Sequence, residues 1–215
     1  MIEELLPSGA ESSEEFGDPA EAVLFPEEEA VIAKAMGKRR REFGSARNCA
    51  RKALGCLGVP PAPILPGERG APQWPDGVVG SITHCAGYRA AVVARARDLL
   101  TVGIDAEPAG RALPDGVLDR VSLPAERAML GELSVAAPGV SWETLLFSAK
   151  ESVYKAWFPL NRRWLGFEDA EITIGTDGTF GARLLVPGGP TCPAGFTGRW
   201  LARNGLVVTA ITTPA

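Results

Sequence analysis

Three acidic residues and a lysine stand at spacings that suit a metal–phosphate site. Residues 102–107 read Val-Gly-Ile-Asp-Ala-Glu, where apolar and polar positions alternate as they do in a half-buried strand. Side chains two apart on a strand share one face, so Asp105 and Glu107 should lie roughly 7 Å apart. Glu151 and Lys155 stand four apart in a predicted helix and therefore share one side of it. Because magnesium combines one or two carboxylates with phosphates and water, this set predicts a magnesium–phosphate site.

Two elements must position these side chains: a strand over about 101–107 and a helix over about 141–158, which we expect Pro159 to end. Asn204-Gly205 between two apolar runs predicts a type I′ hairpin. The other elements predicted from periodicity and turn signals are helices over about 26–36 and 38–57, a helix beginning at Pro124, and strands over about 80–84, 88–94, 168–174, 180–186, 197–203 and 206–213. Each half of the chain thus runs from helix to strands and ends in a hairpin.

This repetition predicts two similar lobes, an N-terminal one over 1–100 and a C-terminal one over 101–215. Within the first lobe, residues 1–22 should form a loose acidic leader, because Ser8-Gly9 and Gly17-Asp18-Pro19 are turn and breaker signals. The first 29 residues hold ten acidic side chains and no Lys or Arg. Eight basic residues then follow within 34–52, and such a run on its own is typical of a solvated helix face.

Composition excludes several classes of protein. The chain has 215 residues, is 46% hydrophobic and carries a net charge of only −4, which argues against bulk attraction to nucleic acid. No apolar stretch approaches the ~20 residues of a membrane span, and the first residues lack the pattern of a signal peptide, so we expect a cytoplasmic protein. The four cysteines form no CxxC pair, which disfavours a disulfide framework or a cysteine metal site.

Three motifs in this order resemble the Sfp-type 4'-phosphopantetheinyl transferases. They are Gly-Ser-Ile-Thr-His-Cys at 80–85, Gly-Ile-Asp-Ala-Glu at 103–107 and Phe-Ser-Ala-Lys-Glu-Ser-Val-Tyr-Lys at 147–155. The segment 157–168 resembles the actinobacterial branch, which serves fatty-acid, polyketide and siderophore assembly lines. The resemblance covers about residues 25–213. It implies an α+β fold, a pseudo-dimer of two similar α/β lobes with the active site in the cleft between them.

The resemblance also implies a reaction. A family member transfers the 4'-phosphopantetheine arm of coenzyme A to a serine of an acyl or peptidyl carrier protein, with Mg²⁺ bound, and releases adenosine 3',5'-bisphosphate. The expected partners are therefore coenzyme A and acyl or peptidyl carrier proteins, with no nucleic acid and no membrane. Because one chain supplies both lobes, we expect a monomer.

Site roles follow from the resemblance and from the chemistry of phosphoryl transfer, which rests on positioning and charge stabilisation. Asp105, Glu107 and Glu151 would hold the magnesium ion. Glu151 could also accept the proton of the carrier serine, directly or through a metal-bound water, and which group takes that proton stays open. Lys155 and Lys150 would neutralise the departing phosphate. The alternative for Glu151 and Lys155 is a surface helix pair.

A second set of residues would bind coenzyme A. His84 is the only histidine and, with the Ser81 or Thr83 hydroxyl, could grip the diphosphate, although a lone histidine is more often structural. Arg39 and Arg47 stand where the family keeps basic residues for the nucleotide, and Arg69 stands where many relatives carry lysine.

The aromatic residues Tyr154, Trp157, Phe158, Trp164 and Phe167 could be core, or could face the pantetheine arm or the carrier. Two other functions compete with transfer. A non-catalytic module that binds coenzyme A or a carrier would need the basic residues but not the carboxylates. A metal-dependent phosphohydrolase would use the same carboxylates with water as the acceptor.

Overall fold

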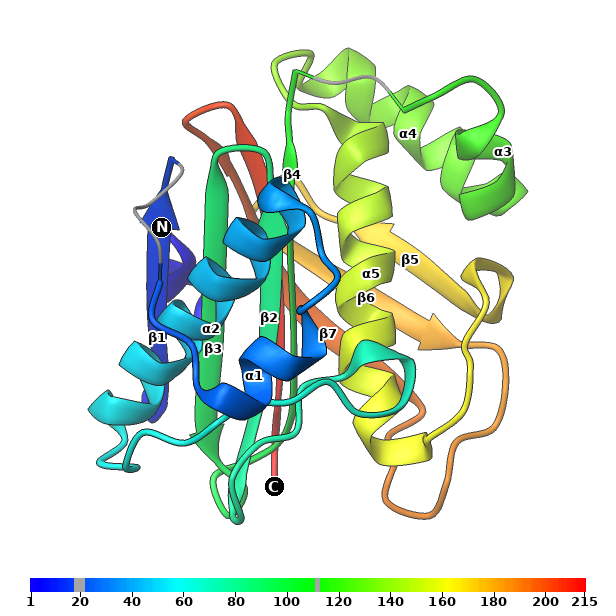
Figure 1. Ribbon diagram of the computed structural model, residues 1–215. Coiled ribbons are helices and arrows are strands. Elements are labelled where there is room, and N and C mark those ends of the chain that lie inside the picture. The colour runs from blue at the N-terminus through cyan, green and yellow to red at the C-terminus, as the bar shows by residue number, and fades with distance from the viewer. Residues whose placement is uncertain (18–21, 111–112) are drawn as a thin grey trace.

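The computed structural model describes residues 1–17, 22–110 and 113–215, which form two antiparallel sheets with helices against them (Figure 1). The first sheet has the order β1-β3-β2, with β1 at Ala10–Phe16, β2 at Val78–Cys85 and β3 at Tyr88–Arg95. The second has the order β4-β8-β7-β6-β5, with β4 at Leu99–Pro108, β5 at Ala170–Ile174, β6 at Thr179–Leu184, β7 at Gly195–Arg203 and β8 at Leu206–Pro214. The α-helices are α1 (Pro26–Val31), α2 (Gly37–Cys56), α3 (Val117–Val121), α4 (Pro124–Ala136) and α5 (Trp142–Asn161), and the short 3-10 helices are η1 (Ile2–Leu5), η2 (Glu68–Gly70) and η3 (Phe167–Asp169).

The alternation of strand side chains creates three apolar cores. Ala91 and Val93 of β3 face α2, whereas their neighbours Ala90 and Val92 face the second sheet. On the second sheet, one face of β4 and β8 meets the first sheet and the other packs beneath α5. Helices α2 and α5 therefore lie on the outer faces of the two packed sheets, α2 along the first and α5 along the second (Figure 1). The predicted α+β class with two helix-and-sheet halves is confirmed.

Two hydroxyl groups join the sheets where β2 runs beside β4. The Ile104 amide donates to Ser81 Oγ and the Ala106 amide donates to Thr83 Oγ1, each at 3.1 Å. These bonds satisfy amides of β4 that face the first sheet without forming a backbone ladder, so the two sheets stay separate. Both hydroxyl-bearing side chains are buried.

A glycine brings α5 directly onto β4. A Cβ at Gly103 would overlap the carbonyl oxygen of Ser152 and come within 2.8 Å of the Ala156 amide nitrogen. One position earlier on the same face, Thr101 Oγ1 donates to the Ala156 carbonyl at 2.8 Å. The polar face of β4, which continues to Asp105, is therefore pressed against the helix that carries the motif lysines and glutamate.

In the N-terminal half, a buried glutamate holds helix α1 to its surroundings. Glu28 is fully buried at the third position of a helix that begins with Pro26, and its carboxylate accepts the Phe25 amide at 3.0 Å. The same carboxylate pairs with Arg51 of α2 at 2.8 Å and accepts the Ile64 amide at 2.9 Å. One side chain thus ties together a helix start, the long helix and a loop.

The C-terminal half repeats this arrangement. Glu126 is the third residue of α4, which also begins with a proline, and accepts the Leu123 amide at 2.6 Å. It pairs with Lys150 of α5 at 2.9 Å and accepts the Ile172 amide at 2.6 Å. Both glutamates are at most 1% exposed. The two halves therefore share a specific polar arrangement, as well as an order of elements.

The predicted loose leader is wrong for residues 1–17. Ile2 is fully buried, and β1 pairs along its whole length with β3. Glu14 of β1 accepts the Met1 ammonium group at 2.6 Å and the Tyr88 hydroxyl at 2.6 Å, so acidic residues of this segment have specific partners. The turn signals do mark breaks in the chain, but no local pattern indicates the strand between them, because its pairing partners lie 72 to 84 residues away. Residues 18–21 of the predicted leader lie outside the described residues.

Two helix ends differ from the prediction. Helix α1 stops at Val31, earlier than expected. Helix α5 continues past Pro159 to Asn161, because a proline removes only its own N–H and the next turn is completed by the Arg162 amide, which donates to the Phe158 carbonyl at 2.8 Å. The predicted turn between β7 and β8 is confirmed, since Asn204 and Gly205 both have positive φ angles of 55° and 73°. Across the described residues, no helix combines the length and the apolar character of a bilayer span.

Candidate active site

Asp105 lies at the centre of the predicted site. Its side chain is buried, and Oδ1 accepts Lys155 Nζ at 2.7 Å and the Thr83 hydroxyl at 3.3 Å. The second oxygen, Oδ2, is buried without a hydrogen-bond partner among the described residues. Buried carboxylate oxygens rarely lack a partner, so this atom marks a place where a ligand or ion completes the structure.

Lys155 connects the helix to the strand. Its ammonium group also donates to the Ile104 carbonyl at 3.0 Å, which uses two of its three N–H donors. The side chain remains 26% exposed, and the third donor has no further protein acceptor within the described ranges. Lys155 can therefore neutralise Asp105 and still offer one N–H to an anion at the surface.

Glu151 lies one helical turn before Lys155 and is half-buried. Burial raises the pKa of its carboxyl group above the ordinary 4.5, the nearby charge of Asp105 raises it further, and Lys155 partly opposes both effects. Asp105 and Glu151 are thus close enough to repel each other. A bound cation would relieve this repulsion.

Glu107 follows Asp105 on the same face of β4 and is partly exposed. Both carboxylates influence Cys85, because burial and then the charges of Glu107 and Asp105 raise the pKa of its thiol to about 12. Across residues 1–17, 22–110 and 113–215, however, no three His, Cys, Asp or Glu side chains are grouped so as to hold a metal ion. The predicted convergence of Asp105, Glu107 and Glu151 on one ion is therefore not confirmed, and the cation that contacts Asp105 is the Lys155 ammonium.

The residues nevertheless fit a hard divalent cation in their chemistry. Asp105 Oδ2 is an orphaned buried oxygen, and Glu151 is a carboxylate whose ionisation is opposed by burial and by a like charge. Carboxylate oxygens are the ligands that magnesium prefers. This fit rests on donor type and electrostatics.

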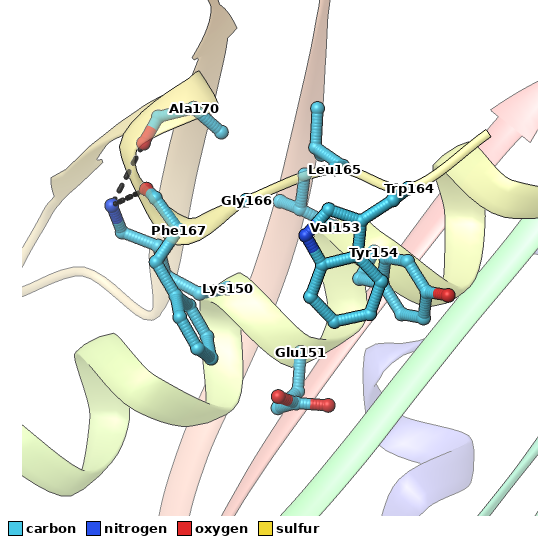
Figure 2. Close-up of a pocket in the computed structure, with 9 residues that line it drawn as sticks. All are labelled: Lys150, Glu151, Val153, Tyr154, Trp164, Leu165, Gly166, Phe167 and Ala170. Carbon is cyan, nitrogen blue, oxygen red and sulfur yellow. Dashed lines mark hydrogen bonds between the residues drawn. The ribbon is translucent and has the colours of Figure 1, made fainter. Parts of the chain in front are cut away.

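A cavity of about 220 Å³ opens beside Glu151 (Figure 2). It lies between α5 and the segment that follows it, and its wall is mainly apolar and aromatic. The residues that line it are Lys150, Glu151, Val153, Tyr154, Trp164, Leu165, Gly166, Phe167 and Ala170. Three of the five aromatic residues singled out in the sequence, Tyr154, Trp164 and Phe167, therefore face this cavity, whereas Trp157 and Phe158 are buried in the core.

Lys150 pairs with none of the three carboxylates predicted to bind the metal ion. Its ammonium group is buried, pairs with Glu126 and donates to the carbonyls of Phe167 and Ala170 at 2.7 and 2.8 Å. Ser81 and Thr83 are likewise occupied, because their hydroxyls accept the amides that join β4 to β2. All three were predicted to bind coenzyme A. The three donors of Lys150 all have structural partners instead, whereas an accepted amide uses only one lone pair of a hydroxyl, so the contacts of Ser81 and Thr83 with coenzyme A stay a prediction.

The basic residues of the N-terminal half have varied surroundings. His84 is exposed at the end of β2, and partial burial followed by the charge of Arg39 lowers its pKa below 6.5, with Glu42 opposing. Arg47 is mostly buried, donates from Nε to the Ile64 carbonyl at 2.9 Å and lies 4.1 Å from the centre of the Phe43 ring. Burial lowers the pKa of Arg47 to about 10, so its charge persists at neutral pH.

Arg69 extends from the N-terminal half towards the cavity. It adopts a left-handed backbone conformation with φ 54°, and its guanidinium lies 5.4 Å from the centre of the Trp164 ring. Trp164 in turn packs on Tyr154, with ring centres 5.0 Å apart. The Tyr154 hydroxyl is buried and has no hydrogen-bond partner in the described part of the chain. Sequence reasoning missed this hydroxyl, and it also missed Glu126, which the repeated Pro-x-Glu at 26–28 and 124–126 could have indicated.

Comparisons with known proteins match both halves of the chain. A family model described as the 4'-phosphopantetheinyl transferase N-terminal domain matches residues 27–94, and one described as the 4'-phosphopantetheinyl transferase superfamily matches residues 101–210. The chain is 57% identical to 4'-phosphopantetheinyl transferase Svp of Streptomyces mobaraensis, over 100% of this chain and 90% of the relative. It is 54% identical to 4'-phosphopantetheinyl transferase PptT of Mycobacterium tuberculosis, over 93% and 90% respectively. Enterobactin synthase component D of Salmonella typhi is 36% identical, over 81% and 72%.

Proposed function

The chain belongs to the 4'-phosphopantetheinyl transferase superfamily, and on that premise we propose how its own residues carry out the reaction. The protein is a transferase that moves the phosphopantetheine group of coenzyme A to a carrier protein. The observation that carries the assignment of residues is the contact of Lys155 with Asp105, beside the half-buried Glu151.

We propose that Asp105, Glu107 and Glu151 hold Mg²⁺, which supplies positive charge to the diphosphate of coenzyme A when bound. Support comes from the orphaned Oδ2 of Asp105 and from the like-charge repulsion that raises the pKa of Glu151. Lys155 has one N–H donor left after its two protein bonds. That donor stabilises the negative charge that develops on the departing phosphate.

Glu151 is the proposed acceptor of the proton from the carrier serine, directly or through one water molecule. A general base works best when its pKa lies near the working pH, and burial together with Asp105 shifts the pKa of Glu151 in that direction. The side chain lines the cavity and is half-buried, so an incoming hydroxyl can approach it.

Coenzyme A is proposed to bind along the two lobes, 1–100 and 101–215. Arg39, Arg47 and His84 would hold its phosphates on the first lobe. The cavity beside Glu151 would hold the pantetheine arm, because its wall is mainly apolar and aromatic and the Glu151 carboxylate lies at its proposed reacting end. Arg69, which reaches Trp164 from the first lobe, would cover the junction between these two parts. Since one chain supplies both parts, we propose that a monomer is active.

The test is incubation of the protein with coenzyme A, Mg²⁺ and an apo carrier protein, followed by intact mass measurement of the carrier. We expect a gain of one phosphopantetheine unit, which a chelator prevents. Release of phosphopantetheine in the absence of carrier would instead favour a phosphohydrolase. Binding of coenzyme A with no modification of any acyl or peptidyl carrier would favour a non-catalytic module.

A further inference from the structure

Lys150 and Glu151 are neighbours in α5, but their side chains have different partners. Successive residues of an α-helix point about 100° apart, so the two cannot share one partner set. Figure 2 shows the Lys150 nitrogen beside the carbonyls of Phe167 and Ala170, while the Glu151 carboxylate points away from these carbonyls. The lysine of this pair is thus separated from the reacting carboxylates.

The Lys150 ammonium has a complete set of acceptors. Its three N–H donors meet Glu126 at 2.9 Å, the Phe167 carbonyl at 2.7 Å and the Ala170 carbonyl at 2.8 Å. The side chain of Lys150 is 1% exposed, as is that of Glu126. A phosphate could bind this ammonium only by displacing one of these partners inside the protein.

The two carbonyls that Lys150 binds belong to the wall of the cavity. Phe167 begins η3 and Ala170 follows it, and both line the cavity together with Gly166. Glu126 also holds the beginning of β5 in place, because its carboxylate accepts the Ile172 amide at 2.6 Å. The ion pair therefore holds the segment 166–172 against α5. The position of this segment determines the shape of the cavity.

We propose that Lys150 is a positioning residue that, held by Glu126, sets the wall of the pantetheine pocket and has no contact with the diphosphate. The proposal rests on the proposed function, since it takes the cavity to be the site of the arm. Loss of this pair should therefore weaken interactions with the pantetheine arm and leave interactions with the nucleotide unchanged.

The experiment compares two ligands by calorimetry in the presence of Mg²⁺: coenzyme A, and adenosine 3'-phosphate 5'-diphosphate, which keeps the diphosphate but lacks the arm. For Lys150→Met we expect the Kd of coenzyme A to rise about tenfold and that of the armless nucleotide to change less than about twofold. In turnover assays the KM for coenzyme A should rise while kcat changes by less than about threefold. Glu126→Gln should shift the same quantities in the same direction.

Arg183→Met is the matched control, because it also removes one cation of an ion pair in the second sheet, here an exposed pair with Glu171. It should change the affinity of neither ligand. The proposal fails if Lys150→Met weakens both ligands equally or weakens neither. Should that variant not fold, as judged by circular dichroism, Glu126→Gln decides by the same criterion. Failure of the wild-type protein to modify any carrier would instead contradict the proposed function, which these binding measurements do not require.

Discussion

Each half of the chain has a buried glutamate at the third position of a helix, and the two glutamates support different parts of the candidate site. In the first lobe, Glu28 fixes Ile64 through its amide, and the Ile64 carbonyl accepts Nε of Arg47. In the second lobe, Glu126 fixes Lys150, which binds the carbonyls of the cavity wall. A repeated structural arrangement thus supports a cationic side chain in one lobe and an apolar wall in the other.

The groups proposed to react, by contrast, all lie in the C-terminal half of the chain. Asp105 and Glu107 lie on β4, and Glu151 and Lys155 lie on α5, which packs on that strand through Gly103. The first lobe offers His84, Arg39 and Arg47, which are suited to binding anions. The two halves therefore share a polar arrangement, whereas the groups proposed to bind anions lie in one half and the groups proposed to react lie in the other.

The largest expected effect comes from removing Glu151. Glu151→Ala should lower kcat by at least about 10²-fold, because it removes both a proposed ion ligand and the proposed base. The measurement is steady-state carrier modification, with circular dichroism to show that the fold is intact. Turnover within about threefold of wild type would show that Glu151 is neither the base nor a required ion ligand.

A substitution at Gly103 should damage the contact that brings the reacting groups together. Gly103→Ala places a methyl group against the Ser152 carbonyl and the Ala156 amide, which are backbone atoms that cannot rotate away. We expect a loss of about 3 kcal/mol in the free energy of unfolding, measured by urea denaturation. Gly131→Ala on α4 is the control, since its Cβ would meet no atom within 4 Å and should stabilise by about 0.5–1 kcal/mol. Equal stabilities of the two variants would contradict the close contact.

Replacing Arg47 tests the binding role of the first lobe. Arg47→Met should raise the KM for coenzyme A about tenfold and leave kcat within about twofold, because the cation is proposed to hold a nucleotide phosphate in ground and transition states alike. Adenosine 3',5'-bisphosphate should lose affinity in parallel. A fall in kcat at unchanged KM would place Arg47 among the reacting groups and weaken the division between the lobes.

The smallest effect is a displacement of the pH profile. Since the pKa of Glu151 in the metal-free protein is raised above 4.5, protons compete with Mg²⁺ for this carboxyl at a higher pH than they would at an ordinary glutamate, and at limiting Mg²⁺ activity should fall on the acid side. The same shift makes the ionised form less stable when folded, so this group favours folding below pH 4.5 and loses that contribution as pH rises through the folded pKa. The acid limb of kcat/KM should be absent from the residual activity of Glu151→Gln. If the limb persists unchanged in that variant, another group controls it.

The sequence was sufficient for the elements that carry local patterns. Alternation predicted β4, helical spacing predicted α5, and Asn204-Gly205 predicted the last hairpin, because these signals depend on neighbours in the chain. The ion pair of Lys150 with Glu126 could not be read in this way, since the partners are 24 positions apart and are buried only when α4 packs on α5. Spacing placed Glu151 and Lys155 on one side of a helix, but only the packing of α5 shows that Lys155 contacts Asp105 and that Lys150 points into the protein.

The hydroxyls of Ser81 and Thr83 also have partners that local sequence patterns do not indicate. A serine and a threonine next to a histidine resemble phosphate ligands, and only the packing of β2 against β4 shows that both are needed as acceptors for strand amides. The strand β1 was missed for the related reason that its partner strand is distant in the chain.

Where β2 runs beside β4, the two sheets are joined by hydrogen bonds to the side chains of Ser81 and Thr83. Strands within a sheet are joined by backbone hydrogen bonds instead. Thr83→Val would keep the shape of the side chain but leave the Ala106 N–H without an acceptor, which should lower the free energy of unfolding by about 1–3 kcal/mol. Backbone pairing depends little on the side chain, whereas these two bonds need a hydroxyl at positions 81 and 83. Anyone who exchanges one lobe for that of a relative must therefore carry Ser81 and Thr83, or their equivalents, across with it.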